Sequence, residues 1–329
     1  MTRRQMLWNE ASRIGCVCVA TFLSLIIVSS VVAQNSGMSH DTWSSGAPMP
    51  KAILGAAAAV LGKRIIVVGG ETSDGKSIAD TYIYNPAANS WSKGVPLPTP
   101  TNSPAAAVVN NILYVFGGED ATFSTGTNAV WAFDPQTKTW SPKSPMPTAR
   151  GQAAAVVEKN NTVYVIGGAI GDTRFNNVES YDPATDTWTE EAPLLVAKSG
   201  PTAGLIGTWI VVADGYTPYE ETGDNEGYNP FTKAWKNGAP DPTPRDNVCG
   251  GSIGTQLYVA GGYPGGWAYT LTESFNGSNN TWTRLADMPQ RTVLSASAVY
   301  NGQLYCFGGV DGWGMSGVTY LNNLQIYQP

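Results

Sequence analysis

Small apolar residues, a short polar turn and a run of larger apolar residues ending in glycine follow one another repeatedly along the chain. The first such run is Ile65-Ile66-Val67-Val68, and it ends in Gly69-Gly70. The pattern returns at the glycine pairs 117–118, 167–168, 261–262 and 308–309, with a degenerate copy at Asp214-Gly215, so it recurs every 47 to 50 residues. A fixed period of this size is typical of a propeller or a solenoid.

Each repeat predicts four β-strands. The segment of small residues, such as 55–60, and the run that ends in the glycines form a hairpin across a turn such as Gly62-Lys63. A longer loop then leads to a third strand that ends in an aromatic residue and to a fourth strand that carries tryptophan. The aromatic residues are Tyr84, Phe133, Tyr181, Tyr228, Phe275 and Tyr327, and the tryptophans are Trp43, Trp91, Trp140, Trp188, Trp235 and Trp282.

The phase of the tryptophans relative to the glycine pairs predicts a closed ring. Trp43 precedes the first glycine pair, whereas the last repeat ends at Tyr327 with no tryptophan strand after it. The stretch around Asp41 to Ser45 must therefore supply the fourth strand of the last repeat. A linear solenoid would need capping repeats instead. Strands of alanine and glycine suit the crowded axis, and tryptophan fills the wedge between diverging sheets. We expect an all-β, six-bladed β-propeller over residues 41–329.

The glycine pair, the aromatic residue and the tryptophan at this period resemble the Kelch repeat, over about residues 41–329. The fourth repeat departs from the pattern at Asp214-Gly215. Galactose oxidase also has a Kelch-type propeller, but its copper site needs histidines and the only histidine here is His40, so that activity is not implied. Exported bacterial six-bladed Kelch proteins include the N-acetylneuraminate epimerase, a mutarotase. This chain resembles that family in its leader, its blade number and its lack of need for a cofactor.

Residues 1–33 have the features of an export signal. Arg3, Arg4 and Arg13 are followed by an uncharged apolar stretch, 14–32, and the small residues before Gln34 suit cleavage. The stretch also approaches the roughly 20 residues that span a bilayer, so a retained anchor is the alternative. We expect an exported protein, periplasmic or extracellular, with residues 34–40 as a linker and a membrane contact only if the leader is retained.

Charge and rare residues exclude several function classes. The formal charge is −6, which disfavours nucleic acid as a partner. The only histidine, His40, lies next to the leader, so we expect no Ser-His-Asp triad and no multi-histidine metal site, and we expect no metal and no cofactor. Cys249 and Cys306 lie in adjacent repeats, and their spacing allows either a disulfide or two buried thiols.

Basic residues recur near the start of the small-residue strand. They lie 16 to 18 residues before the glycine pair or its counterpart, and they are Lys51, Arg150, Lys198, Arg245 and Arg291. In a propeller of this strand order they approach the face that carries the long loops, where a basic ring would attract an anionic ligand. The alternative is that they pair with carboxylates of the opposite loops.

The long loops after the glycines carry the remaining candidates for function. Trp267 and Trp313 fall outside the tryptophan period, and with Tyr216 they could bind a sugar or a peptide, or they could pack the loops down. Arg174 and Tyr263 lie in the same loops. The leading prediction is a module that binds an unknown protein, peptide or sugar through this face. The alternative is a cofactor-free sugar mutarotase of the sialic-acid type, with Glu119, Glu220 or Glu221 as acid or base beside Arg150 or Arg245. A purely scaffolding domain is a third possibility.

Overall fold

The computed structural model describes residues 40–312 and 317–329. Every regular element in these ranges is a β-strand. Among the described residues no helix is long and apolar enough to cross a membrane. The predicted leader and most of the linker fall on residues 1–39, outside the described residues, so the structure does not address them.

Six four-stranded antiparallel sheets form the blades. Blade 1 contains β2 (Ala57–Leu61), β3 (Arg64–Val68), β6 (Thr81–Asn85) and β7 (Ser90–Lys93), and blade 2 contains β8 (Ala105–Val109), β9 (Ile112–Phe116), β10 (Val130–Asp134) and β11 (Thr139–Lys143). Blade 3 contains β12 (Ala154–Val157), β13 (Val163–Ile166), β16 (Val178–Asp182) and β17 (Thr187–Glu190), and blade 4 contains β18 (Thr202–Ile206), β19 (Trp209–Ala213), β20 (Asn225–Asn229) and β21 (Ala234–Asn237). Blade 5 contains β22 (Cys249–Ile253), β23 (Gln256–Ala260), β24 (Thr272–Asn276) and β25 (Thr281–Arg284), and blade 6 contains β26 (Ala296–Tyr300), β27 (Gln303–Phe307), β30 (Leu324–Gln328) and β1 (Thr42–Ser45).

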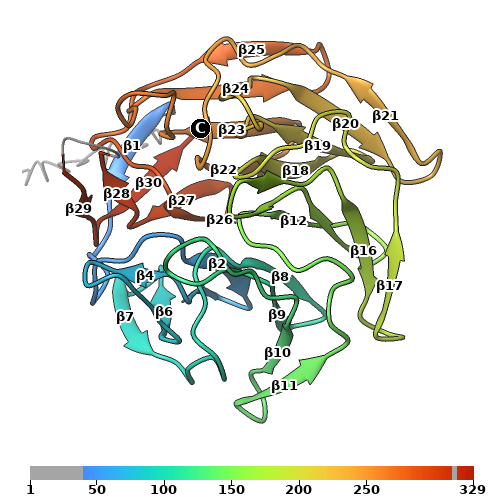
Figure 1. The fold of residues 1–329 in the computed structure, drawn as a ribbon. Coiled ribbons are helices and arrows are strands. Elements are labelled where there is room, and N and C mark those ends of the chain that lie inside the picture. Colours follow the sequence, from blue (N-terminus) through green and yellow to red (C-terminus); the bar gives the residue numbers. More distant parts are fainter. Residues whose placement is uncertain (1–39, 313–316) are drawn as a thin grey trace, which may run out of the picture. The chain divides into compact units, whose positions relative to one another are not determined.

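The first strand closes the ring, as the phase of the tryptophans predicts. Strand β1 pairs antiparallel with β30, with Trp43 opposite Tyr327. Figure 1 looks roughly along the propeller axis, with β2, β8, β12, β18, β22 and β26 at the centre and β7, β11, β17, β21 and β25 at the periphery. The closed six-bladed β-propeller is thereby confirmed.

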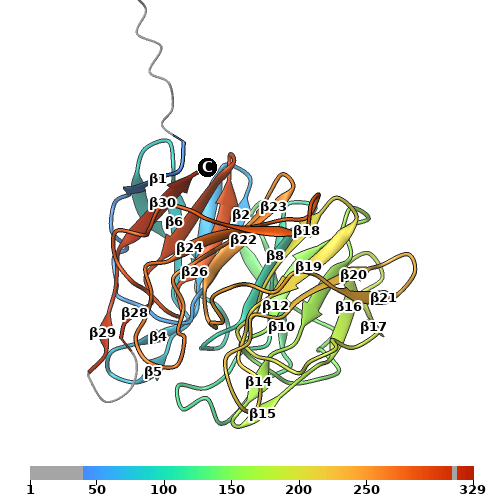
Figure 2. The same cartoon turned by 90° about the horizontal axis from the view of Figure 1, so that it is seen from above.

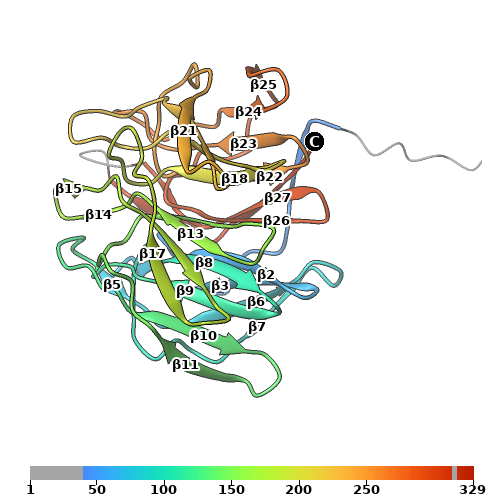
Figure 3. The same cartoon turned by 90° about the vertical axis from the view of Figure 1, so that its right-hand side faces the viewer.

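Small hairpins extend the loops on one face of the ring. They are β4 (Glu71–Thr72) with β5 (Lys76–Ser77), β14 (Ala169–Ile170) with β15 (Thr173–Arg174), and β28 (Val310–Asp311) with β29 (Thr319–Tyr320). In Figures 2 and 3 the labelled strands of these hairpins lie on one side of the propeller, and the C-terminus lies on the other. We call the side that carries the hairpins the loop face.

Backbone hydrogen bonds form a closed belt around the axis, just before each innermost strand. In each blade one residue donates its backbone N–H to the carbonyl of the equivalent residue in the preceding blade, at 2.7 to 3.0 Å. The six residues are Gly55, Ser103, Gln152, Gly200, Asn247 and Leu294. All six have a positive φ, between 49° and 61°. This left-handed conformation is unusual for a leucine, and here it lets every blade hold its neighbour.

The glycine pair gives the chain a second left-handed bend at the end of each second strand. A Cβ on Gly70 would lie 2.6 Å from the carbonyl oxygen of Leu54, too close for any other residue. In blade 4 the first glycine of the pair is replaced by Asp214, which keeps a φ of 61°. The degenerate repeat therefore preserves the backbone path and places a carboxyl group inside the protein.

The blades adhere through apolar and aromatic contacts and through the periodic tryptophans. The indole N–H of each of the six periodic tryptophans donates a hydrogen bond to a backbone carbonyl of the preceding blade, as from Trp43 to Ala286 at 2.9 Å and from Trp91 to Ala47 at 2.8 Å. Cys249 of β22 and Cys306 of β27 form a disulfide with a Cα–Cα distance of 5.7 Å, which joins blades 5 and 6. Of the two alternatives left open by the sequence, the structure contains the disulfide.

Candidate functional site

A pocket opens on the loop face over the belt, with a volume of about 450 Å³. Its walls are the residues that follow the glycine pairs and the residues that precede the belt, which meet in short β-bridges such as Ser199 with Tyr216 and Asp246 with Tyr263. The polar side chains that line it are Gln152, Arg174, Ser199, Tyr216, Glu221, Asp246 and Asn247, and residues such as Phe123, Tyr263 and Leu294 supply apolar surface. We call this set the mouth pocket.

Arg174, at the end of the β14–β15 hairpin, brings a positive charge to the mouth pocket. Its Nη1 donates to the carbonyl of Gly171 at 2.7 Å, and its guanidinium carbon lies 5.0 Å from the centre of the Tyr216 ring. Its buried Nε has no hydrogen-bond partner, and no carboxylate of the described residues lies within ion-pair distance. The stacked ring orients the guanidinium and leaves it able to pair with an anionic group.

Two buried carboxyl groups lie beside this arginine. Asp246 accepts a hydrogen bond from Asn247 Nδ2 at 2.6 Å, and its Oδ1 has no partner in residues 40–312 and 317–329. Burial, with the charge of Glu221, raises the pKa of Asp246 to about 7. Glu119 lies behind Gln152, whose Nε2 donates to it at 2.9 Å, and burial raises the pKa of Glu119 to about 7. Both groups can exchange a proton near neutral pH.

The basic ring expected from the sequence divides into two groups. Arg150, Lys198 and Arg245 are at most 1% exposed. Their backbone carbonyls occupy equivalent positions, because each accepts a hydrogen bond from the N–H of the second residue of a glycine pair or of its Asp214-Gly215 counterpart. In blades 1 and 6 the equivalent carbonyls belong to Ile53 and Thr292. Lys51 and Arg291 are therefore offset along the chain and lie at the surface, paired with Asp80 and Asp311.

The three buried basic residues pair with carboxylates of their own blade instead of facing a ligand. Arg150 lies 3.0 Å from Glu179 and Lys198 lies 2.8 Å from Glu226. These glutamates are the second residues of the third strands β16 and β20. The expectation that Arg150, Lys198 and Arg245 line the channel mouth needs correction, because side chains with no exposed surface cannot contact a bound ligand.

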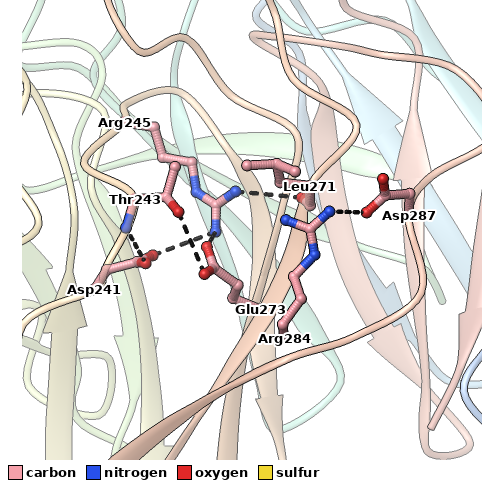
Figure 4. Close-up of polar contacts among 7 residues, drawn as sticks. All are labelled: Asp241, Thr243, Arg245, Leu271, Glu273, Arg284 and Asp287. Carbon is pink, nitrogen blue, oxygen red and sulfur yellow. Dashed lines mark hydrogen bonds and ion pairs between the residues drawn. The ribbon is translucent and has the colours of Figure 1, made fainter.

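Arg245 forms the most extensive of these buried networks. In Figure 4 its guanidinium points between Asp241 and Glu273, with Nη2 at 2.6 Å from Glu273 and 3.3 Å from Asp241. Its Nη1 donates to the carbonyl of Leu271 at 3.3 Å. Asp214 is fully buried nearby, where burial and the charge of Asp241 raise its pKa well above the ordinary value. The separate pair of Arg284 with Asp287 in Figure 4 is solvent-exposed.

The other sequence candidates have different positions. Tyr216 and Glu221 line the mouth pocket, Glu119 lies just behind it, and Glu220 is exposed on the loop. Trp267 is 54% exposed and has the Arg291 guanidinium 5.5 Å from its ring centre. Trp313 lies outside the described residues. Within the described part of the chain, no group of three or more His, Cys, Asp and Glu side chains is arranged to hold a metal ion.

Sequence reasoning did not select Gln152, Asp246 or Asn247. A signal was present, because each lies just before a small-residue strand, where the chain must bend towards the axis. The sequence also contains a signal for the buried ion pairs of blades 3, 4 and 5 that was missed. In blades 3, 4 and 5 the basic residue is followed 28 or 29 positions later by glutamate, as with Arg150 and Glu179.

Comparisons with known proteins agree with this architecture. The model of the KLHDC2/KLHL20/DRC7 Kelch-repeats domain matches residues 32–203, just over half of the chain. The chain belongs to this Kelch-repeat family. The solved structure of YjhT is similar to this Kelch protein with a TM-score of 0.72 at 18% sequence identity, over 85% of this chain and 96% of that one. At this identity the likeness shows the fold alone. No curated protein matches the chain in sequence.

Proposed function

We propose that this Kelch propeller is a binding module whose mouth pocket takes a small polar ligand with a carboxylate, such as a sugar acid. The observation that carries the proposal is Arg174, a guanidinium stacked on Tyr216 in the pocket wall and paired with no carboxylate of the described residues. Planar guanidinium groups bind carboxylates through two parallel hydrogen bonds.

The rest of the mouth pocket suits hydroxyl and amide groups. Gln152, Asn247, Glu221 and Asp246 supply donors and acceptors around a volume of about 450 Å³. Pockets of roughly 300–1,000 Å³ accommodate small organic ligands, with a few polar groups fixing their orientation. Aromatic surface from Phe123 and Tyr263 can cover a sugar ring or a short peptide end.

Calorimetric titration of the purified protein tests this proposal. The panel pairs each hydroxylated carboxylic acid with its neutral amide, starting with N-acetylneuraminate and glucuronate. We expect an acid to bind at least tenfold more tightly than its amide, and Arg174→Gln to abolish that preference. The matched control is Arg284→Gln, which removes an exposed arginine paired with Asp287 elsewhere and leaves binding unchanged. Acids and amides of equal affinity, or an unaffected Arg174→Gln variant, would contradict the proposal.

A second candidate function, sugar mutarotation, is favoured by the acid and base arrangement. Asp246, with a pKa of about 7, lines the same pocket as Glu221 and Arg174. With the sugar carboxylate on Arg174, Asp246 would give a proton to the ring oxygen while Glu221 takes the proton of the anomeric hydroxyl, which opens the ring. Reclosure on the other face of the carbonyl returns both protons.

NMR exchange spectroscopy of N-acetylneuraminate measures mutarotation directly. We expect faster anomer exchange with the wild-type protein, and a loss of at least tenfold in Asp246→Asn. Tight binding of the sugar with anomer exchange at the uncatalysed rate would contradict the mutarotase function and leave the protein as a binding module.

We also propose that the protein is exported. The basic and apolar leader over residues 1–33 supports this proposal, and so does the Cys249–Cys306 disulfide, because disulfides persist in oxidising compartments. Fractionation of cells producing the full chain, with mass spectrometry of its N-terminus, tests it. A cytosolic protein with an intact leader would contradict it.

A further inference from the structure

A second cavity, of about 260 Å³, lies between blades 4 and 5, away from the mouth pocket. Its lining includes Ile206, Trp209, Gly227 and Lys236 of blade 4 and Phe275 of blade 5. None of its lining residues belongs to the mouth pocket. We call it the blade 4–5 cavity.

The cavity arises from an exception to a packing pattern that the other blades share. In each blade one residue of the second strand lies opposite one residue of the third strand, close to the next blade. The pairs are Ile66 with Ile83, Tyr114 with Ala132, Tyr164 with Ser180, Val211 with Gly227, Tyr258 with Ser274, and Tyr305 with Ile326. Blade 4 thus has the smallest pair, and the missing volume is the cavity.

The next blade changes together with these pairs. Where the second strand of a blade supplies a tyrosine, this tyrosine contacts a tyrosine on the third strand of the next blade, as Tyr164 contacts Tyr228 and Tyr258 contacts Tyr327. Opposite Val211 the next blade has Phe275, which has no hydroxyl group. The wall towards blade 5 therefore presents the Phe275 ring, with Gly277 and the polar Asn280 beside it.

The wall towards blade 4 combines an indole with a positive charge. The Nζ of Lys236 lies 3.9 Å from the ring centre of Trp209. No carboxylate of the described residues forms an ion pair with this ammonium group. A Cβ built on Gly227 would lie 3.3 Å from Cε3 of Trp209 and 3.5 Å from Cε of Lys236, so the absence of a side chain at Gly227 leaves space beside the edge of the indole and the lysine stem.

We propose that the blade 4–5 cavity binds a small aromatic carboxylate, with its ring against Phe275 and Trp209 and its carboxylate at Lys236. The volume lies below the roughly 300–1,000 Å³ of pockets for drug-sized ligands, so the ligand is a single fused or substituted ring. Aromatic surface with one charge complements such a molecule, because ring contacts supply affinity and the ammonium group selects the anion.

Ligand-observed NMR with indole-3-carboxylate as the probe, on the full chain, tests this site. We expect saturation transfer from the wild-type protein to the probe. Gly227→Ile should weaken binding at least tenfold, because isoleucine occupies the equivalent position in blades 1 and 6 and would fill the cavity. Arg174→Gln, in the mouth pocket, should leave the affinity unchanged.

A second variant tests the charge without altering the packed interior. Lys236→Met keeps an apolar stem over Trp209 at an exposed position, so we expect it to fold as the wild type does. It should weaken indole-3-carboxylate at least fivefold and leave the neutral indole-3-carboxamide unaffected.

Three results would overturn the proposal. They are no transfer to the probe at millimolar concentration, unchanged binding by Gly227→Ile, and binding lost in Arg174→Gln, which would place the probe in the mouth pocket. An equal loss of acid and amide in Lys236→Met would overturn the assignment of the carboxylate to Lys236.

Discussion

Replacing Arg245 with methionine separates a structural role for this residue from a ligand-binding one. The side chain is fully buried and pairs with Glu273 at 2.6 Å and Asp241 at 3.3 Å. Methionine retains much of the volume but leaves these carboxylates without a cation. Breaking a buried ion pair by removing one partner costs about 3–5 kcal/mol, so we expect the free energy of unfolding to fall by that amount. The exposed Arg291 is the control, and Arg291→Met should cost less than about 1 kcal/mol.

The pH dependence of Arg245→Met gives the sharper test. The charge of Arg245 lowers the pKa of Asp214 and of Glu273, which burial raises. Without it both groups hold their protons to higher pH, and ionising them in the folded state costs more. The stability deficit of the variant should therefore grow as pH rises from 5 to 8. Urea unfolding followed by tryptophan fluorescence measures it. An Arg245→Met variant that is as stable as the wild type at pH 8 but has lost ligand binding would refute the structural role of Arg245.

Further predictions address ring closure, pH and the disulfide. Trp43→Ala removes an indole hydrogen bond and a ring contact at 5.1 Å, so urea unfolding should show a loss of roughly 2–4 kcal/mol; an unchanged midpoint would mean that β1 does not close the ring. Burial raises the pKa of Glu119 and Asp246 to about 7, so both carboxyls are protonated in the fold at pH 5. Their contribution to stability should decline by up to about 3 kcal/mol each as pH rises towards 8, and a slope that Glu119→Gln leaves unaltered would contradict this. Replacing Cys249 and Cys306 with alanine should lower stability by about 2–5 kcal/mol, whereas an unaffected thermal midpoint would show that the disulfide is dispensable.

The fold could be predicted from the sequence because its determinants are local and repeat six times. The phase of Trp43 against the first glycine pair already requires closure by the N-terminal strand. The belt could not be predicted in the same way. Leu294 and Gln152 adopt a left-handed conformation only because hydrogen bonds from neighbouring blades hold them there, and no local residue preference indicates this.

The candidate site was predicted only in part because one or two residues of loop length decide which way a side chain points. Arg291 and Arg245 lie at similar distances before their glycine pairs. However, Arg245 occupies the inward position, whereas Arg291 precedes that position by one residue and lies at the surface. Arg174 and Tyr216 come from different blades, and only the closed ring brings them together. Pairing across blades is a property of the tertiary structure.

A crystal structure of the protein with the tightest acid from the calorimetric panel tests the central claim most directly. We predict the ligand in the mouth pocket, with its carboxylate within hydrogen-bond distance of the Arg174 guanidinium and its ring over the belt residues Gln152 and Asn247. A ligand bound on the opposite face of the propeller, or in the mouth pocket with its carboxylate turned away from Arg174, would contradict the account.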